Sequence, residues 1–160
     1  GGAMTEYEMT SPLPEAERTA TAAALNRVLA DLIDLHLVGK QAHWTLVGPR
    51  FRPLHLQLDE LVDAARTHSD DVAERVVTIG LTPDGRAATV AQDSALPEHP
   101  TGWVRDDDVV DYIVRALRAV IERLRAAIEE TEKTDVVSQD LLIGITADLE
   151  KHLWMFQAER

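Results

Sequence analysis

Residues 25–35 read LNRVLADLIDL, and five of their apolar side chains recur at the spacing of one helix face. The five are Leu25, Val28, Leu29, Leu32 and Leu35. Extended outward, the pattern predicts a helix from about Glu15 to Val47, because Gly48-Pro49 interrupts it. The segments after Pro14 are rich in Ala, Leu, Val, Glu and Arg, so the composition favours an all-α protein.

Three further helices are expected. Their ranges are about Pro53–Ile79, Asp106–Lys133 and Asp135–Ala158. Between the second and third helices, residues 80–105 are rich in Gly and Pro. A structureless loop of that length is unusual, so we expect a crossover that packs on the bundle, with room for a short helix around Arg86–Gln92. Two hairpins joined by a long crossover are the ferritin-like version of a four-helix bundle.

The length and the composition of the chain limit the class of protein and the kinds of site that it can have. The chain of 160 residues fits one domain, which we expect over 15–160, preceded by a tag remnant and an N-terminal arm over 1–14. There is no cysteine, which excludes disulfides, thiolate metal sites and a cysteine nucleophile. No apolar run approaches the ~20 residues that span a bilayer. The net charge of −12 argues against a surface built to neutralise phosphates and is compatible with attracting cations.

Five side chains suited to metal binding are spaced along two of the predicted helices: His43, His55, Asp59, Asp70 and Glu74. At about 100° per residue, positions 55, 59, 70 and 74 fall at roughly 0°, 40°, 60° and 100°, on one side of the second helix. Asp59 and Asp70, however, are ~16 Å apart along the axis. Ligands lie ~2 Å from their ion, so the two halves of the set cannot share one metal within a chain.

An antiparallel two-fold pairing of the second helix joins the two halves, because facing positions then have a constant index sum. The sum is the same for His55 with Glu74, for Asp59 with Asp70 and for Asp63 with Arg66. His43 lies just before the Gly48-Pro49 turn and His55 just after it, so a hairpin places both at similar height. A site of mixed nitrogen and oxygen ligands, without sulfur, suits Fe(II), Mn or Zn.

Other candidates have a plainer interpretation. A single histidine on a bundle helix is usually structural, and that reading is given to His36, His68, His99 and His152. His36 is the nearest to an exception, because it lies seven residues before His43 on the same face. Trp44 is more simply a core or interface residue than a redox partner.

Several motifs together resemble the Dps family, the DNA-binding proteins from starved cells. They are Lys40-Gln-Ala-His-Trp44, Gly48-Pro-Arg-Phe51, His55-x3-Asp59, Asp70-x3-Glu74-Arg75, and, in the last helix, residues 138–142 and 148–154. The resemblance covers about residues 20–158. It separates the chain from ordinary ferritins, whose Glu-x-x-His motif does not occur here.

The resemblance implies a cytoplasmic homododecamer of two-fold dimers, with the nucleoid as a further location. It implies a ferroxidase that oxidises Fe(II) with hydrogen peroxide or dioxygen, two irons per site, and stores ferric mineral against oxidative damage. His43, His55 and Asp59 match the family's ligands from one chain, Asp70 and Glu74 those from its partner, and Trp44 a tryptophan beside the site. Asp135 and Asp140 are candidates for acidic pores, with helix capping and solvation as the alternative.

DNA binding is expected to be weak or absent, because residues 1–18 carry a net charge of −3 and no basic tail is visible. Two alternatives to the enzyme stay open. One is a non-enzymatic helical oligomer that sequesters metal or protects DNA mechanically. The other is a structural bundle whose acidic face is only solvated.

Overall fold

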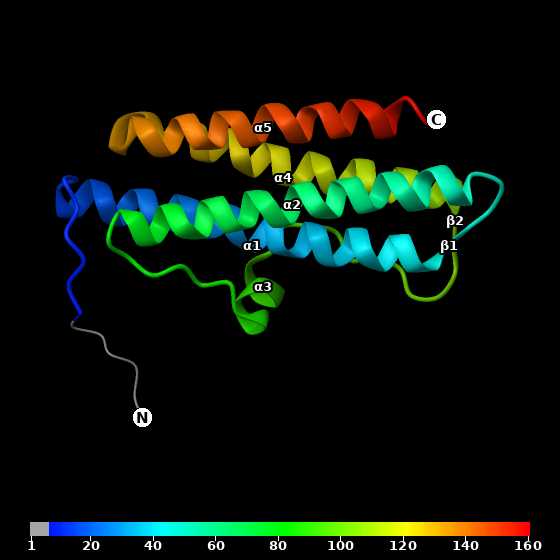
Figure 1. The fold of residues 1–160 in the computed structure, drawn as a ribbon, viewed down its shortest axis with the longest axis horizontal. Coiled ribbons are helices and arrows are strands. Elements are labelled where there is room, and N and C mark those ends of the chain that lie inside the picture. Colours follow the sequence, from blue (N-terminus) through cyan, green and yellow to red (C-terminus); the bar gives the residue numbers. More distant parts are fainter. Residues whose placement is uncertain (1–6) are drawn as a thin grey trace.

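The computed structural model describes residues 7–160, so the first six residues of the expected tag remnant and N-terminal arm lie outside it. Four long helices form the bundle: α1 (Glu15–Thr45), α2 (Phe51–Thr78), α4 (Asp106–Thr134) and α5 (Val136–Gln157). The crossover between α2 and α4 carries a short helix, α3 (Ala87–Asp93), and lies along one side of the bundle (Figure 1). The all-α, ferritin-like architecture and the short crossover helix are therefore confirmed.

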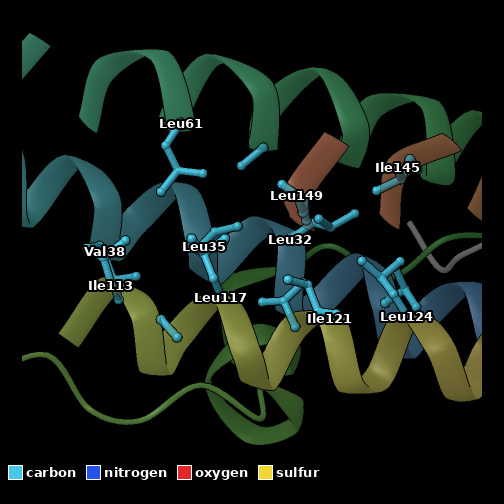
Figure 2. Close-up of a cluster of buried hydrophobic side chains, with 14 of the residues drawn as sticks. Leu32, Leu35, Val38, Leu61, Ile113, Leu117, Ile121, Leu124, Ile145 and Leu149 are labelled. Carbon is cyan, nitrogen blue, oxygen red and sulfur yellow. The ribbon is translucent and has the colours of Figure 1, made fainter. Parts of the chain in front are cut away.

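The core lies between the four long helices. Most of its side chains are leucines, isoleucines, valines and alanines that the helical spacing places on the inner faces, such as Leu35 on α1, Leu61 on α2 and Leu117 on α4 (Figure 2). Ile145 and Leu149 of α5 lie against them. Burial of these side chains is the main driving force for a bundle of this kind. Among residues 7–160, no helix is long and apolar enough to cross a membrane.

The first helix ends two residues earlier than expected. Thr45 is its last residue, and Leu46–Val47 forms a short strand, β1, parallel to β2 (Val104–Arg105), with Leu46 opposite Val104. Both Leu46 and Val104 are buried, so the extended backbone brings an apolar pair into the end of the core. The second helix begins at Phe51, two residues before Pro53, which occupies its first turn.

The crossover is fixed by a buried carboxylate. Asp31 of α1 accepts a hydrogen bond from the Ala95 backbone amide at 2.9 Å and pairs with Arg123 of α4 at 2.9 Å. Burial raises the pKa of Asp31, and the bonds from Ala95 and Arg123 oppose that rise. The expectation that the crossover packs on the bundle is confirmed by these contacts.

The α1–α2 turn requires a glycine. Gly48 has φ +128°, and a Cβ built there would lie 2.7 Å from the Asp106 carboxylate, which accepts a hydrogen bond from the Arg50 amide at 3.0 Å. The turn therefore brings α4 against the hairpin and sets the height of His43 relative to His55.

We predict that Gly48→Ala lowers the free energy of unfolding by about 1–3 kcal/mol, because alanine is strained at this φ and its methyl group meets Asp106. Urea melts followed by circular dichroism measure the loss. Gly144→Ala is the matched control: its Cβ would meet no atom within 4 Å, and the helical site favours alanine over glycine. Equal losses in the two variants would show that the turn tolerates a side chain.

Candidate metal site

Helix α2 presents three distinct faces. Taking His55 as zero and about 100° per residue, the face from roughly 240° to 340° is the buried one. It holds Leu54, Leu58, Leu61, Val62, Ala65, Val72 and Val76. The face from roughly 0° to 100° contains no buried residue. It holds Arg52, His55, Leu56, Asp59, Asp63, Arg66, Asp70, Ala73, Glu74 and Val77. The third face, from roughly 140° to 220°, includes His68 and Arg75, which bond to α5.

The two predicted histidine ligands lie together, as the hairpin argument expected. Their rings stack with centroids 3.6 Å apart and planes 12° from parallel. His43 Nδ1 lies 2.6 Å from the carbonyl oxygen of His55, and His55 Nδ1 lies 2.8 Å from the carbonyl oxygen of His43. Phe51 extends the stack on the far side of His55 at 4.9 Å. The contacts between the two histidines therefore join the end of α1 to the start of α2.

These reciprocal hydrogen bonds determine which nitrogen is available to a metal. A carbonyl oxygen only accepts, so each Nδ1 must carry the proton and donate it. In a neutral imidazole the other nitrogen, Nε2, then has a free lone pair. Both rings are consequently held in the tautomer that coordinates through Nε2, the arrangement in which a second partner orients a metal-binding histidine.

Asp59 lies beside the pair. Its Oδ1 is 3.6 Å from His43 Nδ1, too far for a hydrogen bond, and 2.6 Å from Lys40 Nζ, which donates to it. The Lys40 hydrogen bond lowers the pKa of Asp59, so the carboxylate is charged at neutral pH. Sequence reasoning gave Lys40 and Phe51 no role, although their helical positions relative to His43 and His55 could have suggested one.

Asp70 and Glu74 lie on the same face of α2 as Asp59 and are exposed. Within residues 7–160 of one chain, no three His, Asp or Glu side chains are grouped so that they could hold a metal ion. One chain thus brings His43, His55 and Asp59 together and leaves Asp70 and Glu74 farther along α2. Trp44 is 61 % exposed on the neighbouring part of α1.

The two pore candidates differ. Asp135 is 7 % exposed, caps α5 through the amides of Val137 and Ser138, and pairs with Arg75 at 2.8 Å. Burial raises the pKa of Asp135, but the hydrogen bonds from Ser138 and Arg75 outweigh it and hold the pKa below its usual value. Asp140 is exposed. In one chain Asp135 therefore acts as a helix cap, which was the alternative to a pore role. The pore role stays a prediction for Asp135 and Asp140.

The remaining histidines are dispersed. His36 lies against Arg66, and its Nδ1 is buried without a hydrogen-bond partner. His99 packs edge-on against Tyr112. His68 and His152 both approach Asp148, a grouping that sequence reasoning missed because it joins α2 to α5 across 80 residues.

Comparison with known proteins agrees with the fold. Residues 22–159 match a family model described as ferritin-like domain. A DNA protection during starvation protein of Agrobacterium fabrum is 33% identical over 156 residues, covering 97% of this chain and 96% of that protein. A protein of the same name from Mycolicibacterium smegmatis is 35% identical over 150 residues, covering 91% and 80%. A solved structure, Dps from Microbacterium arborescens in the high iron form, is similar with a TM-score of 0.90 at 33% identity, covering 94% of this chain and 98% of that one.

We predict that Asp135→Asn destabilises the chain at pH 7 by roughly 1–3 kcal/mol, because the Arg75 pair and the charged cap are lost. The folded-state pKa is below the ordinary 3.8, so this stabilisation is present above pH 3.8 and disappears as the pH falls further. The difference between the urea midpoints of the two proteins should therefore be constant from pH 7 to about pH 5 and should shrink as the pH falls below 3.8. Asp140→Asn, at an exposed aspartate on the same helix, serves as control and should show no such difference.

Proposed function

Since the chain belongs to the Dps branch of the ferritin-like family, we propose that it is a ferroxidase and iron-storage protein whose reaction sites are shared between two chains. The observation that carries the proposal is the division of the ligand set on α2. His43, His55 and Asp59 lie together at one end of the hairpin, and Asp70 and Glu74 lie on the same exposed face ~16 Å away.

A two-fold copy of α2 would complete each site. In the antiparallel pairing, His55 faces the partner's Glu74, Asp59 faces the partner's Asp70, and Asp63 faces the partner's Arg66. Apolar side chains support the same contact: Leu37 and Trp44 of α1 and Leu56 and Val77 of α2 are exposed in the single chain. Large exposed apolar side chains that gather on one face are typical of an interface. A homododecamer built from such dimers is the assembly that the family relationship suggests.

The donor set fits Fe(II) as a substrate. Two imidazole nitrogens and carboxylate oxygens bind Fe(II), and the carboxylates favour Fe(III), which is the harder ion. The histidine pair needs no rearrangement of tautomer to receive the metal, because the hairpin carbonyls already hold both Nδ1 protons. Lys40 opposes binding at Asp59, so the incoming cation has to displace the ammonium group from that carboxylate.

The reaction follows from holding two ferrous ions together. A single Fe(II) gives hydrogen peroxide one electron and releases a hydroxyl radical. Two Fe(II) ions deliver two electrons, so that one hydrogen peroxide and two protons become two waters while two Fe(III) form; dioxygen is the alternative oxidant. One of the solved structures similar to this chain is titled as a high iron form, which agrees with iron as the metal.

Charge favours cation entry. Each chain carries −12, so a dodecamer would have a strongly negative surface that concentrates Fe(II). Asp140, which is exposed near the start of α5, is the better of the two pore candidates, since Asp135 is occupied by Arg75. The alternative that a specific observation favours is metal sequestration without oxidation, because the donor set binds Zn(II) as well.

We also propose that the protein acts in the cytoplasm and binds DNA weakly or not at all. The relatives' name refers to DNA protection. In this chain acidic side chains lie before α1 and in its first turn, including Glu8, Glu15 and Glu17. Acidic side chains repel the phosphate backbone, which supplies most of the affinity of non-specific binding.

The activity is tested with aerobic Fe(II) and hydrogen peroxide. The intact protein should oxidise Fe(II) in a fast phase and keep the ferric product soluble. His43→Ala with His55→Ala should lose the fast phase, and helix content and mass by light scattering are measured so that a loss through unfolding or dissociation is recognised. Retention of the fast phase would show that these histidines do not hold the iron, whereas Zn(II) binding without oxidation by the intact protein would favour sequestration.

Sharing between chains is tested by mixing two inactive variants. Chains with His43→Ala and His55→Ala are unfolded and refolded together with chains carrying Asp70→Asn and Glu74→Gln. Random pairing leaves about a quarter of the sites with all five ligands, so about a quarter of the fast phase should return. No recovery from a mixture that assembles normally would place the whole site within one chain and contradict the proposed dimer.

DNA binding is tested by a gel shift with supercoiled DNA at low salt, where electrostatic attraction is strongest. We expect this protein not to retard the DNA at a concentration at which a basic control protein retards it fully. Strong retardation that disappears with added salt would show that a cationic surface exists on the assembled protein.

A further inference from the structure

An apolar cleft lies on the outer side of the bundle, where α1, α2 and the start of the crossover meet. Its volume is about 430 Å³, and its apolar walls come from all three segments: Leu29, Ile33, Ala73, Pro83 and Gly85. Gly85 closes one side of the cleft, since a Cβ there would lie only 2.9 Å from Ile33 Cδ1. Asp70, a candidate ligand that a partner has to supply, lies at the same cleft.

A large apolar side chain is available to fill a cleft of this kind. Trp44 is 61 % exposed, and Leu37, two turns earlier on α1, is 52 % exposed. Trp44 is too far from the cleft of its own chain to occupy it, because Leu29 lies ~22 Å away along the same helix. The occupant has to come from a second copy.

The contacts between α1 and α2 fix which residues of these antiparallel helices lie at the same height (Figure 1). A Cβ on Gly39 would come within 3.0 Å of Val62 Cγ2, so these two residues face each other. Counted from there in opposite directions along the two helices, Leu37 is level with Ala64. Ala64 lies beside the two-fold axis of the pairing proposed above, so Leu37 comes close to its own copy.

The same count places the partner's Trp44 at the cleft. Trp44 is level with Gln57, and Leu29 is level with Val72. The proposed pairing sets the partner's Gln57 opposite Val72, because the two positions are equally far from the axis on its two sides. A two-fold axis between antiparallel helices also keeps both α1 helices on the same side of the α2 pair. The partner's Trp44 therefore arrives level with Leu29 and beside Ala73.

We propose that the indole of Trp44 occupies the apolar cleft of a second copy of this chain, once in each direction across the two-fold axis. This contact rests on the two-chain pairing of the proposed function and identifies the side chain that anchors it. An aromatic ring of this kind buries about 150–250 Å², and a tryptophan that fills a pocket is enriched among the residues that carry the affinity of an interface. Ser69 and Asp70 at the cleft offer acceptors to the indole N–H, which needs a partner when it is buried.

The contact also positions the shared reaction site. Trp44 follows His43 directly in α1, and Ala73 precedes Glu74 directly in α2. Seating the indole against Ala73 thus brings the histidine of one chain toward the partner's carboxylate. Trp44 is a positioning residue and not a ligand, because it acts through the distance between the two halves of the site.

Fluorescence tests the burial of Trp44 directly. Trp103→Phe with Trp154→Phe leaves Trp44 as the one tryptophan of the chain. In the assembled protein its emission should be blue-shifted and acrylamide should quench it weakly, although the indole is 61 % exposed in one chain. Ala73→Phe, which fills the cleft, should return the emission to that of an exposed indole. Ala147→Phe, at an exposed alanine of α5, is the matched control and should leave the emission blue-shifted.

Replacing the anchor tests the strength of the pairing. Trp44→Ala should weaken the association of chains at least about 30-fold, measured by analytical ultracentrifugation over a range of protein concentrations. Its helix content should be unchanged, because the side chain is exposed in the single chain. Trp44→Phe should retain most of the association, since an aromatic ring still enters the cleft.

The contact is overturned by strong acrylamide quenching of Trp44 in a protein that has assembled, or by normal association of the Trp44→Ala variant. Either result leaves the shared site standing if the mixture of histidine and carboxylate variants still recovers the fast phase. A buried Trp44 without recovery of the fast phase in that mixture supports the contact and contradicts the shared site. A chain that stays monomeric overturns both.

Discussion

The α1–α2 hairpin is held by two hydrogen bonds that run in opposite directions between the same two residues. Each of His43 and His55 donates from Nδ1 to the other's backbone carbonyl, and the two rings stack between them. The pairing ties the end of α1 to the start of α2 and, at the same time, leaves both Nε2 atoms free. Gly48 makes it possible, because the turn can approach Asp106 closely only without a side chain. The conformation of the turn and the positions of the two candidate histidine ligands therefore depend on the same pair of hydrogen bonds.

Helix α2 shows how one sequence can serve three neighbours. Most of its leucines and valines face the core, its candidate ligands His55, Asp59, Asp70 and Glu74 face outward, and His68 and Arg75 bond to α5. Because each residue advances a helix by about 1.5 Å and turns it by about 100°, every position of α2 belongs to one fixed face. A substitution on α2 should accordingly be judged by its face before its chemistry.

Most of the fold could be predicted from the sequence because helical periodicity is a local signal. The long helices, the crossover and its short helix follow from spacing and from Gly and Pro. The strand at Leu46–Val47 could not be predicted, since its partner Val104 is distant in sequence and the pairing is set by burial. The histidine pair was within reach because the Gly48-Pro49 turn joins the two helices. The link from His68 to Asp148 was not, because it depends on the α2–α5 register, which no local pattern reports.

The proposed shared site makes the chemistry depend on assembly. The proposed shared site needs a partner to supply Asp70 and Glu74, so a chain that has not assembled cannot complete it. If an isolated chain bound one Fe(II) at His43, His55 and Asp59, that ion would react without a second one beside it, which is the one-electron condition that releases hydroxyl radical. Pairing of two chains would therefore complete the ligand set and allow the two-electron reaction in the same step.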